Sequence, residues 1–387
     1  MAPTLRDVTA LLDQWYDPAW AEPWDAVGLV CGDPDQPVTK VLFAVDPAPA
    51  VAAEAVGWGA DLLVCHHPLL LSGVHGVAAT SPKGRVVHDL VRAGVALMTA
   101  HTNADQPADG VNEALARAVG IGDAQVLLAP DDPDNDRELD ALVTFVPHEH
   151  VDGVRRALAA AGAGALGDYE AASFTSVGEG RFRPLPGAEP AVGQVGRSEV
   201  VPESRIETTL PRRLRGAVVA ALLAAHPYEE VAYDLHEIDH PAGSPTRGHG
   251  RIGRLATPTT LRGFATAVGE ALPATAHGVR VSGDPDRPVE TVAVGCGSGD
   301  FLLDTVLGTP ADVYLTSDLR HHRAAEFREH DGPALVDVAH WAAEWTWLPV
   351  VERKLRRALG ADGVAGGTTV ETRVSTIVTD PWTFRVD

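Results

Sequence analysis

The sequence is poor in cysteine and contains no long apolar run. Its three cysteines, Cys31, Cys65 and Cys296, lie far apart, and none belongs to a CxxC pair. An odd number of widely spaced cysteines argues against a disulfide framework and against a zinc site made of thiolates. The first residues carry acids and lack the apolar core of a secretion signal. No stretch reaches the roughly 18 to 20 uninterrupted apolar residues of a membrane helix. We therefore expect a soluble, cytoplasmic protein without a membrane partner.

Positive charge is also scarce. Lysine and arginine together number 31, against 53 aspartates and glutamates, which gives a formal net charge of -22. This balance argues against a general nucleic-acid-binding surface, so nucleic acid is not expected as a partner. The same surplus of acids either favours cations as ligands or simply keeps the protein soluble. With 387 residues and 45% hydrophobic composition, the chain can bury a substantial core and form two or three domains.

The first and last thirds of the chain alternate between apolar, β-branched segments and segments with helical spacing. In the first third, strands are predicted at 38–45, 61–65 and 95–99, and helices at 4–15, 49–57, 84–93 and 110–119. In the last third, strands are predicted at 289–294, 312–316 and 334–338, and helices from Phe301, at 321–328 and at 340–359. Such alternation predicts an α/β fold with mainly parallel sheets flanked by helices.

The middle of the chain has a different order of elements. The predicted order is strand 139–146, helix 150–161, strands near 172–177 and 200–208, helix 211–225 and strand 231–238. This βαββαβ order is typical of an α+β ferredoxin-like domain. Breaker-rich segments at 131–136 (DDPDND) and 240–250 (HPAGSPTRGHG) flank it and indicate linkers. We therefore expect a core domain split into residues 1–136 and 246–387, with an inserted domain at 137–245.

Three of the predicted strands are followed by metal-ligand residue types. These residues are His66 and His67 after 61–65, His101 and Asp105 after 95–99, and His340 and Glu344 after 334–338. Ligand sites in parallel sheets lie beyond the carboxyl ends of the strands. Imidazole and carboxylate suit divalent Zn, Fe, Mn, Co or Ni. Six potential ligands exceed the need of one tetrahedral ion, so the set predicts two divalent metal ions.

Spacing indicates how some of these side chains project. His340 and Glu344 are four residues apart, so a helix would place them on one face, whereas residues 104–107 look more like a loop. His66 and His67 are adjacent, and neighbours on a strand point to opposite faces. Because Pro68 favours an extended conformation for His67 as the chain leaves the sheet, we expect the two histidines to serve one ion each.

Three further segments follow predicted strands in the last third. Residues 295–300 (GCGSGD) could cradle a phosphate or form a tight structural turn, since the segment is neither a P-loop nor a GxGxxG. Ser317, Asp318, His321 and His322 follow the strand at 312–316. We expect them to line the same cleft as partners of the ligands or of the substrate, rather than to bind metal directly.

Four motifs occur in an order that resembles the NIF-three-like dinuclear-metal proteins, a family that many genomes label GTP cyclohydrolase I type 2 homologues. The motifs are WDAVGL at 24–29, HHP at 66–68, HTNAD at 101–105 and His340-x-x-x-Glu344. The middle segment, with GEGRFRP, SRIET and HPYEEVAYD, resembles the insert of the longer bacterial branch. That insert is similar to small trimeric signalling-type ferredoxin-like domains.

The resemblance implies a set of metal ligands and an assembly. The ligands would be His66, His67, Asp105, His340 and Glu344, with His101 as a sixth ligand or a close neighbour. The assembly would be a toroidal homohexamer whose sites face an internal cavity. The sequence departs from the usual pattern at Ala26, where the family often has Asn, and at Ala339 and Ala343, which replace Gly and Ser. These changes keep every proposed ligand and bear on the residues around them.

Two classes of function follow from these expectations. The first is a metal-dependent hydrolase that acts on a nucleotide-like or phosphorylated small molecule, with Glu344 and His101 moving protons. If the family label holds, the substrate is GTP. The second is a metal-handling (metallochaperone) or regulatory protein, in which the insert is a sensor or a gate. A scaffold whose metals only stabilise the fold is a third possibility.

Overall fold

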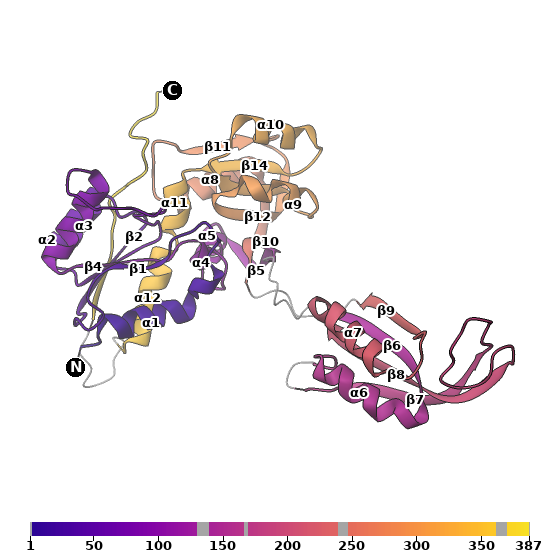
Figure 1. Cartoon of the computed structure of the whole chain (residues 1–387). Coiled ribbons are helices and arrows are strands. Elements are labelled where there is room, and N and C mark those ends of the chain that lie inside the picture. Colours follow the sequence, from indigo (N-terminus) through magenta and orange to yellow (C-terminus); the bar gives the residue numbers. More distant parts are fainter. Residues whose placement is uncertain (1, 130–138, 166–168, 239–246, 361–369, 387) are drawn as a thin grey trace. The chain divides into compact units, whose positions relative to one another are not determined.

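A computed structural model describes residues 2–129, 139–165, 169–238, 247–360 and 370–386. The chain forms two compact units (Figure 1). Unit 1 comprises Met1–Pro130 and Ser244–Asp387, and unit 2 comprises Asp131–Gly243. The predicted linker DDPDND lies outside the described residues. Each unit has its own hydrophobic core, so each is described by itself.

Unit 1 contains two sheets with parallel centres. The first has the order β1 (Gly28–Cys31), β4 (Ala96–Thr99), β3 (Leu62–Cys65), β2 (Lys40–Ala44) and β15 (Glu371–Val374). The second has the order β11 (Val279–Ser282), β14 (Ala334–Val338), β13 (Val313–Ser317), β12 (Pro288–Ser298), β10 (His249–Thr260) and β5 (Ile121–Leu128). Strands β4, β3, β2 and β15 run parallel, as do β12, β13 and β14, while antiparallel strands lie toward the edges. The predicted α/β class is confirmed.

Helices cover these sheets. They are α1 (Leu5–Trp15), α2 (Pro49–Trp58), α3 (Pro82–Ala93), α4 (Thr102–Asp105), α5 (Val111–Ala118), α8 (Leu261–Ala271), α9 (Leu303–Leu307), α10 (His321–Glu329), α11 (His340–Trp345) and α12 (Leu348–Ala358), with short 3₁₀ turns η1 (Pro18–Trp20) and η4 (Gly299–Leu302). The first helix begins with a capping box. The Asp7 backbone N–H donates to the Thr4 hydroxyl, and the Thr4 backbone N–H donates to the Asp7 carboxylate. No helix in the described ranges is long and apolar enough to cross a membrane.

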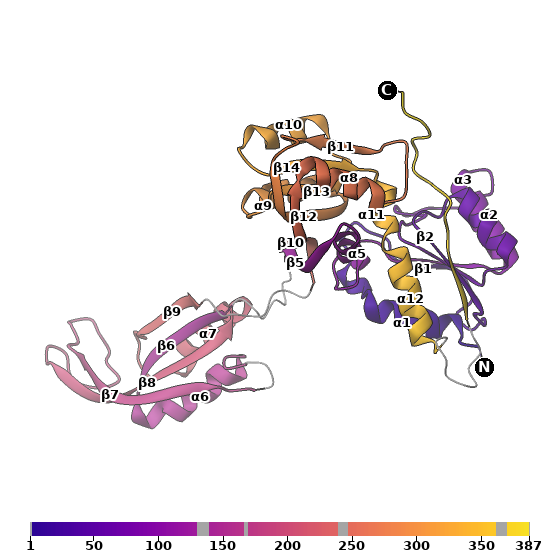
Figure 2. The ribbon, with the colours of Figure 1, turned by 180° about the vertical axis from the view of Figure 1, so that it is seen from behind.

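Two apolar clusters occupy the opposite faces of the first sheet. Leu42, Leu63 and Leu97 face a cluster that includes α2 and α3, whereas Phe43 and Val64 face the larger cluster of α1, α12 and α5. Figures 1 and 2 show the two helix pairs on opposite sides of the strands. Alternate residues therefore contact alternate layers, as the two-residue period of a strand requires. The larger cluster continues into the second sheet, so unit 1 has one continuous core between its sheets.

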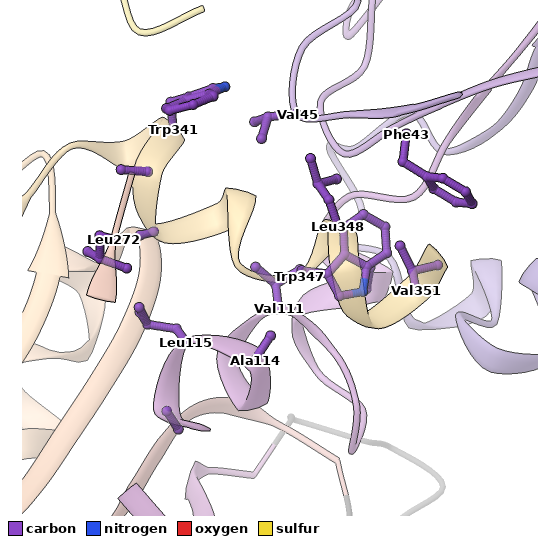
Figure 3. Packing of buried hydrophobic residues seen from close by; sticks show 14 of the residues in the cluster. Phe43, Val45, Val111, Ala114, Leu115, Leu272, Trp341, Trp347, Leu348 and Val351 are labelled. Atoms are coloured by element: carbon purple, nitrogen blue, oxygen red, sulfur yellow. The ribbon is translucent and has the colours of Figure 1, made fainter. Parts of the chain in front are cut away.

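Trp347 lies at the centre of this larger core. It is fully buried, and its indole N–H donates to the Tyr16 hydroxyl at 3.2 Å. Figure 3 shows it packed among Val111, Leu348 and Val351. The helix predicted at 340–359 is in fact two helices, α11 and α12, and Trp347 stands between them. Helix α11 carries His340 and Glu344, and α12 covers the first sheet at β2 and β15.

The chain passes toward unit 2 and back through neighbouring strands. Strands β5 and β10 pair antiparallel, with His249 opposite Leu128. The linker predicted at 240–250 therefore extends too far, because β10 begins at His249. Residues 239–246 lie outside the described part of the chain.

Unit 2 is a four-stranded antiparallel sheet with two helices. Its elements are β6 (Leu139–Pro147), α6 (Val151–Ala160), β7 (Ser173–Phe182), β8 (Glu199–Pro211), α7 (Arg215–Ala225) and β9 (Tyr233–Ile238). The strand order is β7-β8-β6-β9, and every neighbouring pair is antiparallel. Residues of both helices share one apolar cluster with β6 and β8. We interpret this order as ferredoxin-like.

Candidate metal centre

Four histidines of unit 1 meet beyond the ends of its strands. His66 and His67 follow β3, His101 lies two residues beyond β4, and His340 begins α11 after β14. The ring centroids of His66 lie 5.1 Å from those of His67 and His101, and those of His67 and His340 are also 5.1 Å apart. The two sheets thus bring together histidines from three separate strand ends.

The Nδ1 atom of each of these histidines is held by an oxygen acceptor. The contacts are His66 to the Ala100 carbonyl at 2.9 Å, His67 to Asp46 at 2.7 Å, His101 to Asp25 at 2.7 Å and His340 to Asp318 at 2.7 Å. A carbonyl or a carboxylate has no proton to give, so each Nδ1 donates its own. In the neutral ring, each Nε2 then carries a lone pair. This arrangement is typical of histidines that bind a metal through Nε2.

Two of these Nε2 atoms point at each other. Nε2 of His67 and Nε2 of His340 are 3.2 Å apart. Two lone pairs at this separation repel unless a proton or a metal cation lies beside them. The geometry therefore favours binding of a positive charge at this point.

Glu344 lies among the imidazoles. Its carboxylate is buried, with Oε1 2.8 Å from Nε2 of His340 and 3.4 Å from Nε2 of His66. Its Oε2 lies 2.9 Å from Nε2 of His67, but without the alignment of a hydrogen bond. Oδ1 of Asp105 lies 3.7 Å from Nε2 of His66. A buried carboxylate oxygen without an aligned donor is a ligand atom suited to a cation.

The electrostatics of the site favour positive charge. Burial alone would lower the pKa of His67, but Glu344 and Asp46 outweigh it and raise the pKa to about 10. Burial likewise opposes the charge on His340, but Glu344 and Asp318 raise its pKa to about 11. Burial would raise the pKa of Glu344, yet the three neighbouring histidines hold it well below its usual value. A metal ion that binds here therefore displaces protons.

Two sets of three ligand atoms each lie within 4.8 Å of one another. The sets are His66, His67 and His101, and His67, His340 and Glu344. His67 occurs in both sets, so the assignment of His66 and His67 to one ion each remains a prediction. Asp105 lies at the end of α4, not in the loop expected at 104–107, and it approaches the site from the His66 side.

The residues predicted to line the cleft differ in their positions. Asp318 contacts His340, and its backbone φ of 56° is in the left-handed region. His321 and His322 lie exposed at the start of α10 and belong to neither ligand set. In the segment 295–300, a Cβ on Gly297 would lie 2.9 Å from Oε1 of Glu344. This glycine, with φ 68°, gives the strand end room beside the carboxylate.

Two aspartates that hold the histidines were not identified from the sequence as functional. Asp25 lies within the quoted WDAVGL motif and accepts hydrogen bonds from His101 and from both the backbone N–H and the hydroxyl of Thr102. Burial would raise the pKa of Asp25, but these hydrogen bonds hold it well below its usual value. Asp46 lies two residues beyond β2. The sequence does contain one signal for Asp46. It follows a buried strand, and the neighbouring strand is followed directly by histidines.

Known proteins share this sequence and fold. The family model of Duf34/NIF3 (NGG1p interacting factor 3) matches residues 3–381. The chain belongs to this family. A relative from Mycobacterium tuberculosis, named "GTP cyclohydrolase 1 type 2 homolog", is 48% identical over 383 residues, which is 99% of this chain and 97% of the relative. A protein of the same name from Bacillus subtilis is 36% identical and covers 98% of both chains.

Solved structures of Duf34/NIF3 relatives agree with the fold. The Bacillus cereus protein related to NIF3 is 34% identical, has a TM-score of 0.66 and matches over 100% of both chains. Staphylococcus aureus protein SA1388 is 26% identical, with a TM-score of 0.64 over 99% of both chains. The family resemblance expected from the four motifs is confirmed. Membership of the Duf34/NIF3 family and the histidine and glutamate cluster both indicate metal binding.

Proposed function

We propose that this Duf34/NIF3 chain is a hydrolase with a dinuclear metal centre. The observation that carries the proposal is the convergence of four histidines whose Nδ1 atoms are all held by acceptors, around one buried glutamate. The proposed ligands are His66, His67, His101, Asp105, His340 and Glu344. Because they offer only nitrogen and oxygen atoms, they suit Zn, Fe, Mn, Co or Ni.

The chemistry that two such ions supply is Lewis-acid activation of water and of the bond to be cleaved. The chain's own residues would position the reactants and move protons. Asp25 fixes the His101 ring. Where His101 is a close neighbour of the ions rather than a sixth ligand, its Nε2 would accept or donate a proton. Glu344 would accept a proton through whichever of its carboxylate oxygens does not bind an ion. The edge of the partly exposed Trp24 packs against His101 at 5.9 Å between ring centroids and would guide the substrate toward it.

The proposed substrate is a nucleotide-like or phosphorylated small molecule. The printed name of the Mycobacterium tuberculosis and Bacillus subtilis relatives, GTP cyclohydrolase 1 type 2 homolog, supports GTP as the first compound to test. Family membership also supports a homo-oligomer, for which we propose a hexamer, and we propose the cytoplasm as the location of the protein.

Metal affinity is expected to rise with pH. In the metal-free chain, the raised pKa values of His67 and His340 stabilise the fold fully below pH 6.5, and this stabilisation is lost as pH rises toward about 10 and about 11. A metal ion must displace these protons when it binds. For each displaced proton, the apparent metal affinity should rise by up to about tenfold per pH unit between pH 6.5 and the raised pKa. Competition with a chromophoric chelator at several pH values, corrected for protonation of the chelator, measures the slope. A slope of zero would contradict the proton displacement.

The decisive experiment is anaerobic purification with metal analysis, followed by a screen against nucleotides and phosphoesters. We expect two ions per chain and multiple turnovers of one compound at fixed metal loading. In a His66→Ala variant, metal and turnover should be lost together. Full turnover by metal-free His66→Ala protein would refute the hydrolase. Transfer of metal to an acceptor protein without any turnover would instead support the metal-handling alternative.

A further inference from the structure

Unit 2 contains a cavity that is separate from the metal centre. Its volume is about 750 Å³, and it lies between β7, β8 and the segments at 182–192 and 228–232. Cavities of roughly 300 to 1,000 Å³ with mainly apolar walls are the usual size of small-molecule sites. The apolar wall is formed by Phe145, Phe182, Pro184, Pro190, Val192 and the ring of Tyr228. The cavity is therefore large enough for a molecule of nucleotide size.

A buried carboxylate forms part of this cavity. Glu203 is 8% exposed, and its Oε1 accepts a hydrogen bond from the Tyr228 hydroxyl at 2.7 Å. Its Oε2 has no hydrogen bond among the residues that the structure describes. A Cβ on Gly180 would lie 2.0 Å from this oxygen, so the glycine provides the space that Oε2 occupies. Because Glu203 lines the cavity, this oxygen can accept a hydrogen bond from a ligand in place of solvent.

The aromatic wall is held in place by a second set of contacts. The Tyr228 backbone N–H donates to Nδ1 of His226 at 3.1 Å, and Nε2 of His226 bonds the Phe145 carbonyl at 2.9 Å. The rings of Tyr228 and Phe182 lie 6.0 Å apart with an edge-to-face tilt. A wall fixed in this way is pre-organised, so few of its side chains need to be ordered when a ligand binds.

Charged side chains of both signs line the rest of the cavity, namely Arg181, Arg183 and Arg205 together with Glu179, Glu229 and Glu230. Arg181 pairs with Glu179, and Arg205 pairs with Glu207. The exposed Arg183 uses its Nε to donate to the Gly196 carbonyl at 3.1 Å, and no ion pair of its guanidinium occurs among the described residues. The cavity thus presents a carboxylate acceptor in its buried part and a guanidinium at its exposed side. A guanidinium is suited to bind phosphate or carboxylate groups.

We propose that this cavity binds a small anionic molecule with a planar nitrogen heterocycle, of the guanine nucleotide type. Adjacent N–H groups of the heterocycle donate to Glu203, the ring packs against the wall formed by Phe182 and Tyr228, and the anionic group reaches Arg183. This site lies entirely within unit 2, so the inference stands whether or not the metal centre is a hydrolase.

The test uses the full-length chain and GMP as the probe. Isothermal titration calorimetry should detect GMP binding, with weaker binding of AMP, whose ring presents an acceptor where GMP presents the N1–H donor. Glu203→Gln and Gly180→Ala should each reduce GMP affinity by about tenfold or more, because both remove or displace the acceptor. Gly153→Ala in α6 is the matched control, since Gly153 does not line the cavity and a Cβ there meets nothing within 4 Å. Hydrogen exchange should slow at 173–182 and 199–211 when GMP is added.

Several outcomes would overturn the proposal. One is the absence of GMP binding at millimolar concentration by the wild-type chain. Another is GMP binding that survives Glu203→Gln and Gly180→Ala but is lost in His67→Ala, which would place the nucleotide at the metal centre. A change of oligomer size in both unit 2 variants, without GMP binding by the wild type, would show that a second copy of the chain fills the cavity.

Discussion

Replacement of His67 by alanine is expected to remove bound divalent metal at both proposed positions. His67 occurs in both sets of converging ligand atoms, 2.9 Å from Oε2 of Glu344 and 3.2 Å from Nε2 of His340. Loss of a residue that merely orients a ligand typically costs about 10- to 100-fold in metal affinity. Loss of the ligand itself should therefore lower metal affinity by more than about 100-fold. Metal analysis after dialysis, together with competition against a chelator, measures the effect.

Two comparison variants sharpen this experiment. Asp318→Asn keeps every ligand but weakens the hydrogen bond that orients His340, so a loss of about 10- to 100-fold is expected. His321→Ala removes an exposed histidine that belongs to neither ligand set and should leave affinity unchanged. If His67→Ala retains as much metal as His321→Ala, the proposed ligand set is wrong.

The second large effect concerns Arg251, a buried arginine in β10. Its guanidinium pairs with Glu113 at 2.9 Å and donates to the backbone carbonyls of Gly248, Gly250, Gln106 and Pro107. Arg251→Met would remove one of the two guanidinium partners of the partly buried Glu113, which keeps Arg117, and one donor from each of the four backbone carbonyls. The expected loss in the free energy of unfolding is about 3–5 kcal/mol, the range for breaking a buried pair on one side. Urea denaturation measures this loss.

Tryptophan fluorescence makes this measurement specific. All eight tryptophans lie outside residues 131–243, so the emission reports the unfolding of unit 1. Arg254→Met is the matched control on the same strand, because Arg254 is exposed and pairs with Glu290 at the surface. It should cost less than about 1 kcal/mol. If Arg251→Met and Arg254→Met lower the free energy of unfolding equally, burial of Arg251 does not explain its contribution.

The histidines of the site could be predicted from the sequence, and so could Asp318 as a partner residue, whereas which aspartate meets which histidine could not. Apolar runs of four or five residues mark the buried strands, so the residues directly beyond them are visible in the sequence. The contact between Asp46 and His67 depends on strand register. Ala44 pairs with Cys65 in the parallel β2–β3 ladder, which places the second residue beyond each strand side by side. Register is set by packing of the whole sheet and cannot be read from either segment alone.

Strand β5 and the division between α11 and α12 were not predicted, because both depend on contacts with distant parts of the chain. Strand β5 has an irregular pattern of buried and exposed residues, because it lies at the edge of its sheet and pairs through backbone groups. The division between α11 and α12 also has no strong breaker before it, since Pro349 is compatible with the first turn of a new helix. The position of Trp347 in the core, which fixes this break, depends on residues such as Tyr16 at the other end of the chain.

The discontinuous origin of the histidine cluster has a consequence for biosynthesis. His67 and His340 are 273 residues apart, so at 5 to 20 residues per second the ribosome needs roughly 14 to 55 s to deliver the second after the first. During that interval the nascent chain carries His66, His67 and His101 without Glu344. Unit 2, which lies between them in the sequence and has its own core, can fold in the meantime. The residues of both converging sets are therefore present together only near the end of translation, after α11 has been made.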